Sequence, residues 1–176
     1  DNTVYVDDTG HESVRCCRAD GFGIQKLRKL GIYAAIVTSE EKGPVYSRAR
    51  KLGLELFYGI EDKRDWFLNF VNFHAKEIAF VGNDINDLEL LKVVDFPFIV
   101  PDAEPALLHH GFNLLARKGG CGAVREVCDL IADAYEKASN PIVTAYPINF
   151  PIKSNTISQS AAEKYQLDPI PPWMLS

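Results

Sequence analysis

The stretch Phe80-Val81-Gly82-Asn83-Asp84-Ile85-Asn86-Asp87-Leu88 decides the fold of this 176-residue chain. An apolar segment over 77–81 ends in a glycine turn, and amide and carboxylate side chains follow just ahead of an amphipathic segment. This order is typical of a parallel strand whose carboxyl end leads into a helix, where open α/β sheets bind ligands. Asn83, Asp84 and Asp87 therefore predict a Mg²⁺ site, because Mg²⁺ prefers one or two carboxylates together with substrate phosphate. A solvated acidic loop without a metal is the alternative.

Hydrophobic periodicity extends this motif into an α/β domain over residues 1–138. Short apolar segments alternate with segments of helical spacing, which predicts a doubly wound, Rossmann-like parallel sheet. A β-hairpin is expected over 3–16, around the turn Asp7-Asp8-Thr9-Gly10. The expected core strands are 34–37, 54–58, 77–81, 96–100 and one near 114, and the first of them is expected to be buried. The expected helices are 24–30, 45–52, 66–74, 86–94, a short one after 101, and 122–137.

Residues 139–176 have a different composition. Six of the ten prolines lie there, without sustained periodicity. This predicts an extended tail or linker, either free or ordered by a partner or a further domain.

Composition and charge exclude several classes of protein. The hydrophobic content of 47% and charged content of 24% are those of a globular protein, and the net charge of −5 argues against nucleic-acid binding. No apolar run reaches the roughly 18 residues of a membrane span, and no signal segment is recognised. The spacings of Cys16, Cys17, Cys121 and Cys128 fit neither a disulfide framework nor a zinc site. We expect buried, reduced thiols in a cytoplasmic protein, with the last two on one helix face.

Three further groups of residues follow expected strand ends or precede a helix. Thr38 and Ser39 could hold a phosphate, or could cap the next helix. Lys63 could neutralise phosphate charge, or could be a solvated surface lysine. The loop 18–21 precedes the first core helix, and its Asp20 could contact substrate or act as an N-cap.

Taken together, Thr38, Lys63 and 82–87 resemble motifs two, three and four of the haloacid dehalogenase superfamily of Mg²⁺-dependent phosphohydrolases. Further residues narrow the likeness to a subfamily with a small β-hairpin flap in place of a large cap. That subfamily includes 3-deoxy-manno-octulosonate 8-phosphate phosphatases and the phosphatase-like carboxyl-terminal domain of acylneuraminate cytidylyltransferases. The residues that carry this narrower likeness are Tyr5, Gly10, Glu12, 18–24 and 119–127.

The resemblance implies a site for a phosphorylated acidic sugar. Thr38 would hold the transferring phosphoryl group and Lys63 would balance the negative charge. Mg²⁺ would be bound by Asp84 or Asn83, with support from Asp87. The residues implied in substrate binding are Arg18, Asp20, Gly21 and Ser39. The resemblance also implies a homotetramer with the hairpin as interface and lid.

The first motif of the superfamily is not recognisable in this sequence. It carries an Asp nucleophile and a second Asp two residues later, on a strand just ahead of the hairpin. Asp7 does not fit, because two residues later stands Thr9. We therefore expect negligible turnover from the chain as given. It would be either a piece of a longer phosphatase or a catalytically inactive oligomerisation domain attached to a cytidylyltransferase.

Two other departures from the subfamily pattern bear on the substrate. Asn83 stands where many relatives have a carboxylate, so Mg²⁺ affinity should fall. Cys121 replaces an arginine of the octulosonate phosphatases. This change removes a side chain that could bind a sugar carboxylate or phosphate through two hydrogen bonds. Both changes favour a nonulosonate, the sialic acid type of sugar. A signalling receiver domain is the third hypothesis, but its acceptor Asp and late lysine have no convincing counterpart.

Overall fold

The computed structural model describes residues 3–41, 43–70 and 77–138, and the expected tail at 139–176 lies outside them. The end of the expected helix 66–74 is outside them as well. The strands are β1 (Tyr5–Val6), β2 (Glu12–Ser13), β3 (Ala35–Val37), β4 (Glu55–Phe57), β5 (Ala79–Gly82), β6 (Phe96–Ile99) and β7 (Asn113–Leu114). The α-helices are α1 (Arg18–Lys29), α2 (Pro44–Leu52), α3 (Lys63–Phe70), α4 (Leu88–Leu91) and α5 (Ala123–Ala138), and the 3-10 helices are η1 (Ile85–Asp87) and η2 (Pro105–His109).

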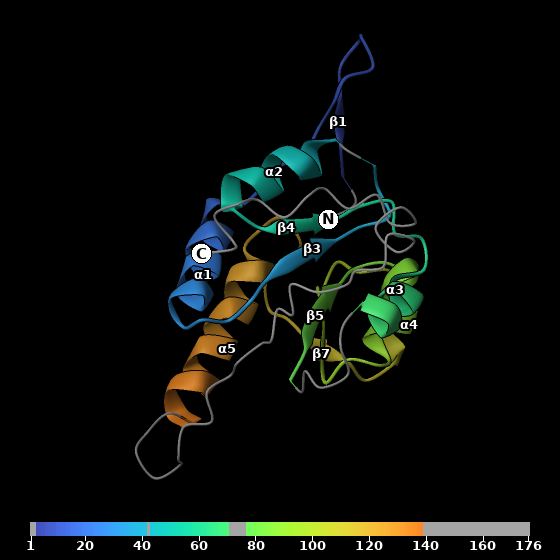
Figure 1. The fold of residues 1–176 in the computed structure, drawn as a ribbon. Coiled ribbons are helices and arrows are strands. Elements are labelled where there is room, and N and C mark those ends of the chain that lie inside the picture. Colours follow the sequence, from blue (N-terminus) through green and yellow to red (C-terminus); the bar gives the residue numbers. More distant parts are fainter. Residues whose placement is uncertain (1–2, 42, 71–76, 139–176) are drawn as a thin grey trace.

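The core strands are parallel and lie between two layers of helices. β3 pairs with β4, and β6 pairs with both β5 and β7, always in parallel register. Helices α1 and α5 pack together on one side of the strands, and α3 and α4 lie on the other (Figure 1). The fold class predicted from the alternation of elements, a doubly wound α/β domain, is confirmed.

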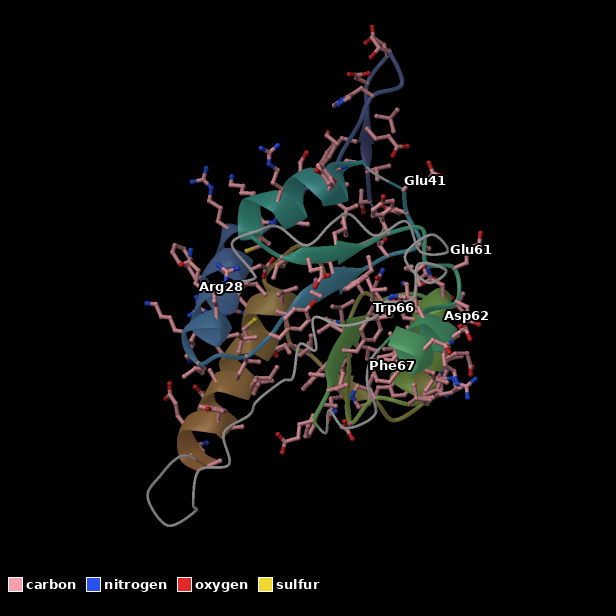
Figure 2. All side chains as sticks on the ribbon, in the orientation of Figure 1. Arg28, Glu41, Glu61, Asp62, Trp66 and Phe67 are labelled. Carbon is pink, nitrogen blue, oxygen red and sulfur yellow. The ribbon has the colours of Figure 1, made fainter. Side chains whose placement is uncertain are left out.

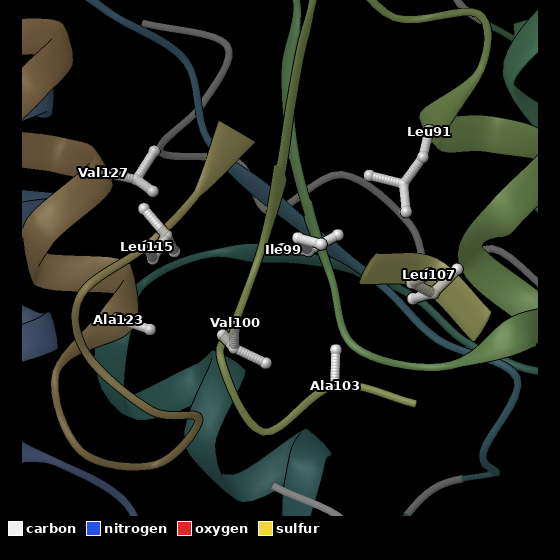
Figure 3. Close-up of a cluster of buried hydrophobic side chains, with 8 residues drawn as sticks. All are labelled: Leu91, Ile99, Val100, Ala103, Leu107, Leu115, Ala123 and Val127. Carbon is white, nitrogen blue, oxygen red and sulfur yellow. The ribbon is translucent and has the colours of Figure 1, made fainter. Parts of the chain in front are cut away.

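Three clusters of buried side chains make up the described core. The largest joins β6 and the helices around it, with Leu107 fully buried and Ile99 2% exposed (Figure 3). A second lies between α1 and α5, around Ile24 and Ala132. In the third, Phe57 of β4 packs on Trp66 of α3, with ring centroids 4.8 Å apart. Figure 2 labels Trp66 on α3, on the side of the helix nearer the strands.

The predicted hairpin is present and stands out from the domain. β1 and β2 are antiparallel, with Tyr5 opposite Ser13 (Figure 1). Asp7 fixes the turn, because its Oδ1 accepts hydrogen bonds from the backbone N–H groups of Thr9 and His11, each at 2.9 Å. The large apolar side chains exposed along the hairpin are Val4, Tyr5, Val6 and Val14.

Several local expectations were wrong. The segment 18–21 is not a loop, because α1 already begins at Arg18 after the extended Cys17. The strand expected to be buried has Ala35 exposed and the next two residues only partly buried. Cys121 and Cys128 do not share a helix face, since Cys121 precedes α5 and is exposed whereas Cys128 is buried. In the part of the chain that the structure describes, no helix is long and apolar enough to cross a bilayer.

Close packing of α1 on α5 depends on a glycine, and we predict that Gly23→Ala destabilises the domain. A Cβ at Gly23 would lie 2.9 Å from Cys128 Cβ and 3.1 Å from Arg125 Cα, so the helices must move apart. Overpacking of this kind costs about 1–3 kcal/mol, offset in part by the better helix propensity of alanine. Urea unfolding should show a lower free energy of unfolding. The control is Gln25→Ala on the exposed face of α1, and equal stability of both variants would contradict the packing argument.

The packing of α1 on α5 also protects the thiol of Cys128. Burial raises the pKa of Cys128 to about 11, and the nearby carboxylates of Asp129 and Asp20 act in the same direction. The thiolate is the reactive form, so we expect Ellman's reagent at pH 8 to label exposed Cys16 and Cys121 readily but Cys128 only after unfolding. Mass spectrometry of labelled peptides identifies the sites, and rapid native labelling of Cys128 would refute the prediction.

Candidate functional site

The loop after β5 folds back on itself through Asp87. The Oδ2 atom of Asp87 accepts hydrogen bonds from the backbone N–H groups of Asn83 at 2.8 Å and Asp84 at 3.2 Å. Asp84 Oδ1 accepts from Ile85 N at 2.7 Å, and the Asp84 side chain also accepts from the backbone N–H of Asp87, which completes a capping box at η1. A Cβ at Gly82 would lie 2.7 Å from Asp87 Cβ, so only glycine permits this approach. The sequence motif thus fixes the orientation of Asn83 and Asp84.

Lys63 binds the other oxygen of Asp87. The Nζ–Oδ1 distance is 2.5 Å, and the two residues are 7% and 3% exposed. Lys63 is the first residue of α3, so this ion pair joins α3 to the carboxyl end of β5. Asp87 is therefore a positioning residue that holds both Lys63 and the Asn83–Asp84 loop. The alternative that Lys63 is only a solvated surface residue is wrong.

The end of β3 reaches the same place. Ser39 Oγ accepts a hydrogen bond from Asn86 Nδ2 at 3.1 Å, which links the loops after β3 and β5. Its neighbour Thr38 pairs with Phe57 and Ile60 through its backbone. The Oγ1 atom of Thr38 accepts from Glu40 N at 3.1 Å.

The proposed capping role of Thr38 and Ser39 is not what the structure shows. The N-cap residue of α2 is Gly43, and it makes no side-chain capping hydrogen bond. The Thr38 hydroxyl instead closes a local turn on Glu40, so Thr38 and Ser39 act in the loop after β3. The loops after β3 and β4 also carry exposed Glu41, Glu61 and Asp62, which are labelled in Figure 2.

The candidate metal ligands are few. Among residues 3–41, 43–70 and 77–138, no group of three or more His, Cys, Asp or Glu side chains is placed to hold a metal ion. The candidate ligand set in this loop is the Asp84 carboxylate and the Asn83 amide oxygen. These hard oxygen donors fit Mg²⁺, which usually keeps waters and a substrate phosphate in its coordination shell.

Beside this loop lies a pocket of about 180 Å³. It is lined by Asp20, Val81, Gly82, Asn83, Val100, Gly119, Gly120, Ala123 and Val124. Asp20 accepts a hydrogen bond from Arg125 N at 3.0 Å, so it caps the start of α5 rather than its own helix α1. Desolvation raises the pKa of Asp20, while the Arg125 N–H, Arg48 and Arg117 act against that shift. The pocket therefore joins a candidate metal ligand, Asn83, to a candidate substrate contact, Asp20.

Three arginines that the sequence did not single out gather near the same helix ends. Arg15 Nη2 lies 3.0 Å from Cys121 Sγ, and Arg48 Nη2 donates to the Cys17 carbonyl oxygen at 2.7 Å. Arg117 Nη1 would be 3.1 Å from a Cβ at Gly122. No sequence signal could have found this group, because its members come from three separate segments and share no spacing.

Two other predicted substrate residues lie elsewhere on α1. A Cβ at Gly21 would meet Leu52 Cδ2 of α2 at 3.1 Å, so this glycine serves helix packing. Arg18 is an exposed residue at the start of α1. The structure shows no described contact that brings either residue into the pocket.

The ion pair leads to a prediction about stability. Lys63→Met leaves the Asp87 carboxylate buried without its cation, which typically costs about 3–5 kcal/mol. Lys63→Met/Asp87→Asn should be less destabilised than Lys63→Met, because it removes the uncompensated charge. Arg64→Met, one residue along and exposed, is the control. Chemical unfolding measures all four proteins. If Lys63→Met lowers the free energy of unfolding no more than Arg64→Met does, the interpretation as a buried ion pair is wrong.

Comparison with known proteins identifies relatives of this chain. No family model matches the chain. It is 34% identical over 141 residues to the 3-deoxy-D-manno-octulosonate 8-phosphate phosphatase of Yersinia pestis, covering 78% of this chain and 75% of that protein. The Escherichia coli K12 enzyme of the same name is 32% identical, with the same coverage.

Solved structures give the same result. The crystal structure of the Yersinia pestis phosphatase superposes with a TM-score of 0.71 at 33% identity, over 77% of this chain and 75% of that one. The structure of the Moraxella catarrhalis phosphatase, solved with magnesium, phosphate and KDO, gives a TM-score of 0.68 at 28% identity. The match covers 78% of this chain and 85% of that one. The chain belongs to the 3-deoxy-D-manno-octulosonate 8-phosphate phosphatase family of the haloacid dehalogenase superfamily.

Proposed function

We propose that this chain forms the metal- and phosphate-binding part of a Mg²⁺-dependent phosphatase for a phosphorylated acidic sugar. The observation that carries the proposal is the meeting of two strand ends. The Lys63–Asp87 ion pair and the Asn86–Ser39 hydrogen bond bring a lysine, hydroxyl groups and oxygen atoms that could bind a metal together at one edge of the parallel strands. Ligands of open α/β sheets bind at this edge.

The reaction would convert a sugar phosphate and water into the free sugar and inorganic phosphate. The phosphorus–oxygen ester bond breaks, and the sugar oxygen takes a proton. Bound Mg²⁺ would neutralise charge on the phosphoryl oxygens. The Thr38 hydroxyl, which accepts from Glu40 N, keeps its own proton for a phosphoryl oxygen, and Lys63 adds positive charge. The nucleophile of the superfamily belongs to its first motif, which is not recognisable in this sequence.

An acidic sugar of eight or nine carbons fits the surroundings. The positive charges of Arg15, Arg48 and Arg117 lie near the pocket end of α1 and α5 and suit a sugar carboxylate. The names of the relatives favour 3-deoxy-D-manno-octulosonate 8-phosphate as the substrate, whereas Asn83 and Cys121 favour a nonulosonate 9-phosphate. Arg15 beside Cys121 offers a guanidinium close to the arginine position of the octulosonate phosphatases.

A second function rests on the hairpin. Its exposed apolar residues favour an interface in a homotetramer, and the chain would then be an inactive oligomerisation domain attached to a cytidylyltransferase. For either function we propose a cytoplasmic location.

Metal binding separates these functions. We predict that Mg²⁺ raises the thermal unfolding temperature of the chain, by an amount corresponding to about 2.7 kcal/mol at a hundredfold excess over the dissociation constant. Asp84→Ala should abolish the rise. Glu89→Ala, which removes an exposed carboxylate on nearby α4, should keep it. No Mg²⁺ effect on the parent chain would count against the phosphatase site.

Turnover provides the companion measurement. Phosphate release from either sugar phosphate should be negligible for the chain as given. Mg²⁺-supported release that Asp84→Ala abolishes would overturn that expectation, and would show that the described residues suffice for catalysis.

A further inference from the structure

Two cysteines from distant parts of the chain lie where helices α1 and α5 begin. Cys17 is the N-cap residue of α1, and Cys121 lies two residues before the first residue of α5. The sulfur of Cys17 is 3.7 Å from the place that a Cβ at Gly122 would occupy, and Gly122 follows Cys121 directly. The packing of α1 on α5 therefore brings these two residues close to each other, although they are far apart in sequence.

The side chain of Arg15 indicates which of the two adjacent cysteines faces Cys121. Arg15 Nη2 donates to Cys121 Sγ at 3.0 Å. Cys17 has an extended backbone, and side chains two residues apart in an extended segment point to the same side. Cys17 therefore lies on the side of Arg15 and Cys121, whereas Cys16 points the other way. Their exposure agrees with this, because Cys16 is exposed and Cys17 is only partly so.

The loop that carries Cys121 can adjust without disturbing the core. Gly120 and Gly122 flank the cysteine and have φ angles of 63° and 100°, in the region that glycine adopts without strain. Cys121 itself is exposed and belongs to none of the described buried clusters. Its side chain can therefore turn from Arg15 toward Cys17 while the buried residues stay in place.

The surroundings of the two sulfurs are those of reactive thiols. Guanidinium groups lie close to both cysteines, because Arg15 contacts Cys121, and Arg48 Nη2 donates to the Cys17 carbonyl oxygen at 2.7 Å. Within residues 3–41, 43–70 and 77–138, no three His, Cys, Asp or Glu side chains are placed to hold a metal ion. Thiols with positive neighbours, access to solvent and a second thiol nearby are those that oxidise reversibly.

We infer that Cys17 and Cys121 are a redox-active pair, whose reversible disulfide acts on the neighbouring pocket. Residues 119–120 of the Cys121 loop line that pocket together with Asn83. Disulfide formation takes Cys121 Sγ away from Arg15, so the N–H group that donated to the sulfur becomes available to an anion beside the pocket. The effect on sugar binding rests on the proposed function, whereas disulfide formation does not.

Hydrogen peroxide is a sufficient oxidant for this step. The Cys121 thiolate attacks one peroxide oxygen, the O–O bond breaks, and the departing hydroxide takes up a proton to become water. The product is a sulfenic acid at Cys121. The Cys17 thiolate then attacks that sulfur, the S–O bond breaks, and the second hydroxide also leaves as water. The two thiols lose two electrons and two protons, and a small thiol reverses the reaction by thiol–disulfide exchange.

Peptide mapping of the oxidised full chain tests the pairing. After treatment with hydrogen peroxide, free thiols are blocked with N-ethylmaleimide, and the tryptic peptides are identified by mass spectrometry. Cleavage after arginine and lysine releases Cys16 and Cys17 in the peptide 16–18 and Cys121 in the peptide 119–125. We expect a disulfide between Cys17 and Cys121 in a chain that stays a monomer on a non-reducing gel, with Cys16 carrying the maleimide. A disulfide through Cys16, or links only between chains, would overturn the inference.

Two adjacent serine variants give a matched comparison. Cys17→Ser should lose the disulfide and should still fold, because serine is a favoured N-cap residue. Cys16→Ser, at the more exposed neighbour, should keep the disulfide. Oxidation should raise the urea concentration at which parent and Cys16→Ser unfold, since the cross-link closes a loop of about a hundred residues in the unfolded chain. Dithiothreitol should remove that shift. An intramolecular disulfide that survives in Cys17→Ser would refute the pairing.

Ligand binding separates this inference from the phosphatase proposal. The probe is 3-deoxy-D-manno-octulosonate 8-phosphate, added with Mg²⁺ to the oxidised and the reduced chain and followed by calorimetry. We expect the oxidised chain to bind about tenfold more tightly, the factor that one hydrogen bond to a charged group contributes. Arg15→Gln should lose this gain but still form the disulfide, and Cys17→Ser should bind equally under both conditions.

The possible outcomes of this titration have different meanings. Binding to neither form, with the disulfide present, would count against the proposed function and leave the redox pair established. Measurable but equal affinity of the oxidised and reduced chains would overturn the effect of the disulfide on the pocket.

Discussion

The buried contact between Lys63 and Asp87 is the interaction on which the site depends. A buried ion pair contributes little net stability compared with apolar residues of the same size, because both charges lose their hydration. Its value here is geometric. One carboxylate binds the lysine with one oxygen and holds the Asn83–Asp84 loop with the other. The position of α3 is thereby coupled to the orientation of the candidate metal ligands.

This coupling matters more because the hydrophobic core does not supply it. The described clusters belong either to β4 and α3, to α1 and α5, or to β6 and its neighbours. Helix packing keeps these parts together, but side-chain packing alone allows small shifts between helices. A short, buried, charged contact tolerates much less displacement. The polar residues at the strand ends therefore specify the alignment of the two halves.

Periodicity and turn residues predicted most of the elements correctly. Gly53 ends α2 in the left-handed conformation, as its place after an amphipathic segment suggested, and the hairpin turn follows from Asp7 and Gly10. What failed depends on tertiary neighbours. Asp20 looked like a cap for its own helix, yet it caps α5 more than a hundred residues away in sequence. The burial of 34–37 could not be predicted either, because the burial of an apolar strand depends on which elements pack on its faces and edges.

The charge balance of the site explains how Asn83 suits this arrangement. With Lys63 neutralising Asp87, the remaining charge of the β5 loop is the single negative charge of Asp84. An aspartate at position 83 would bind Mg²⁺ more tightly, but it would also add repulsion toward a phosphate dianion. The amide keeps an oxygen ligand without that charge. Further negative charge on the metal must then come from the phosphate. Metal and phosphate would thus bind to the same edge of the sheet as mutually supporting parts, because each supplies charge that balances the other.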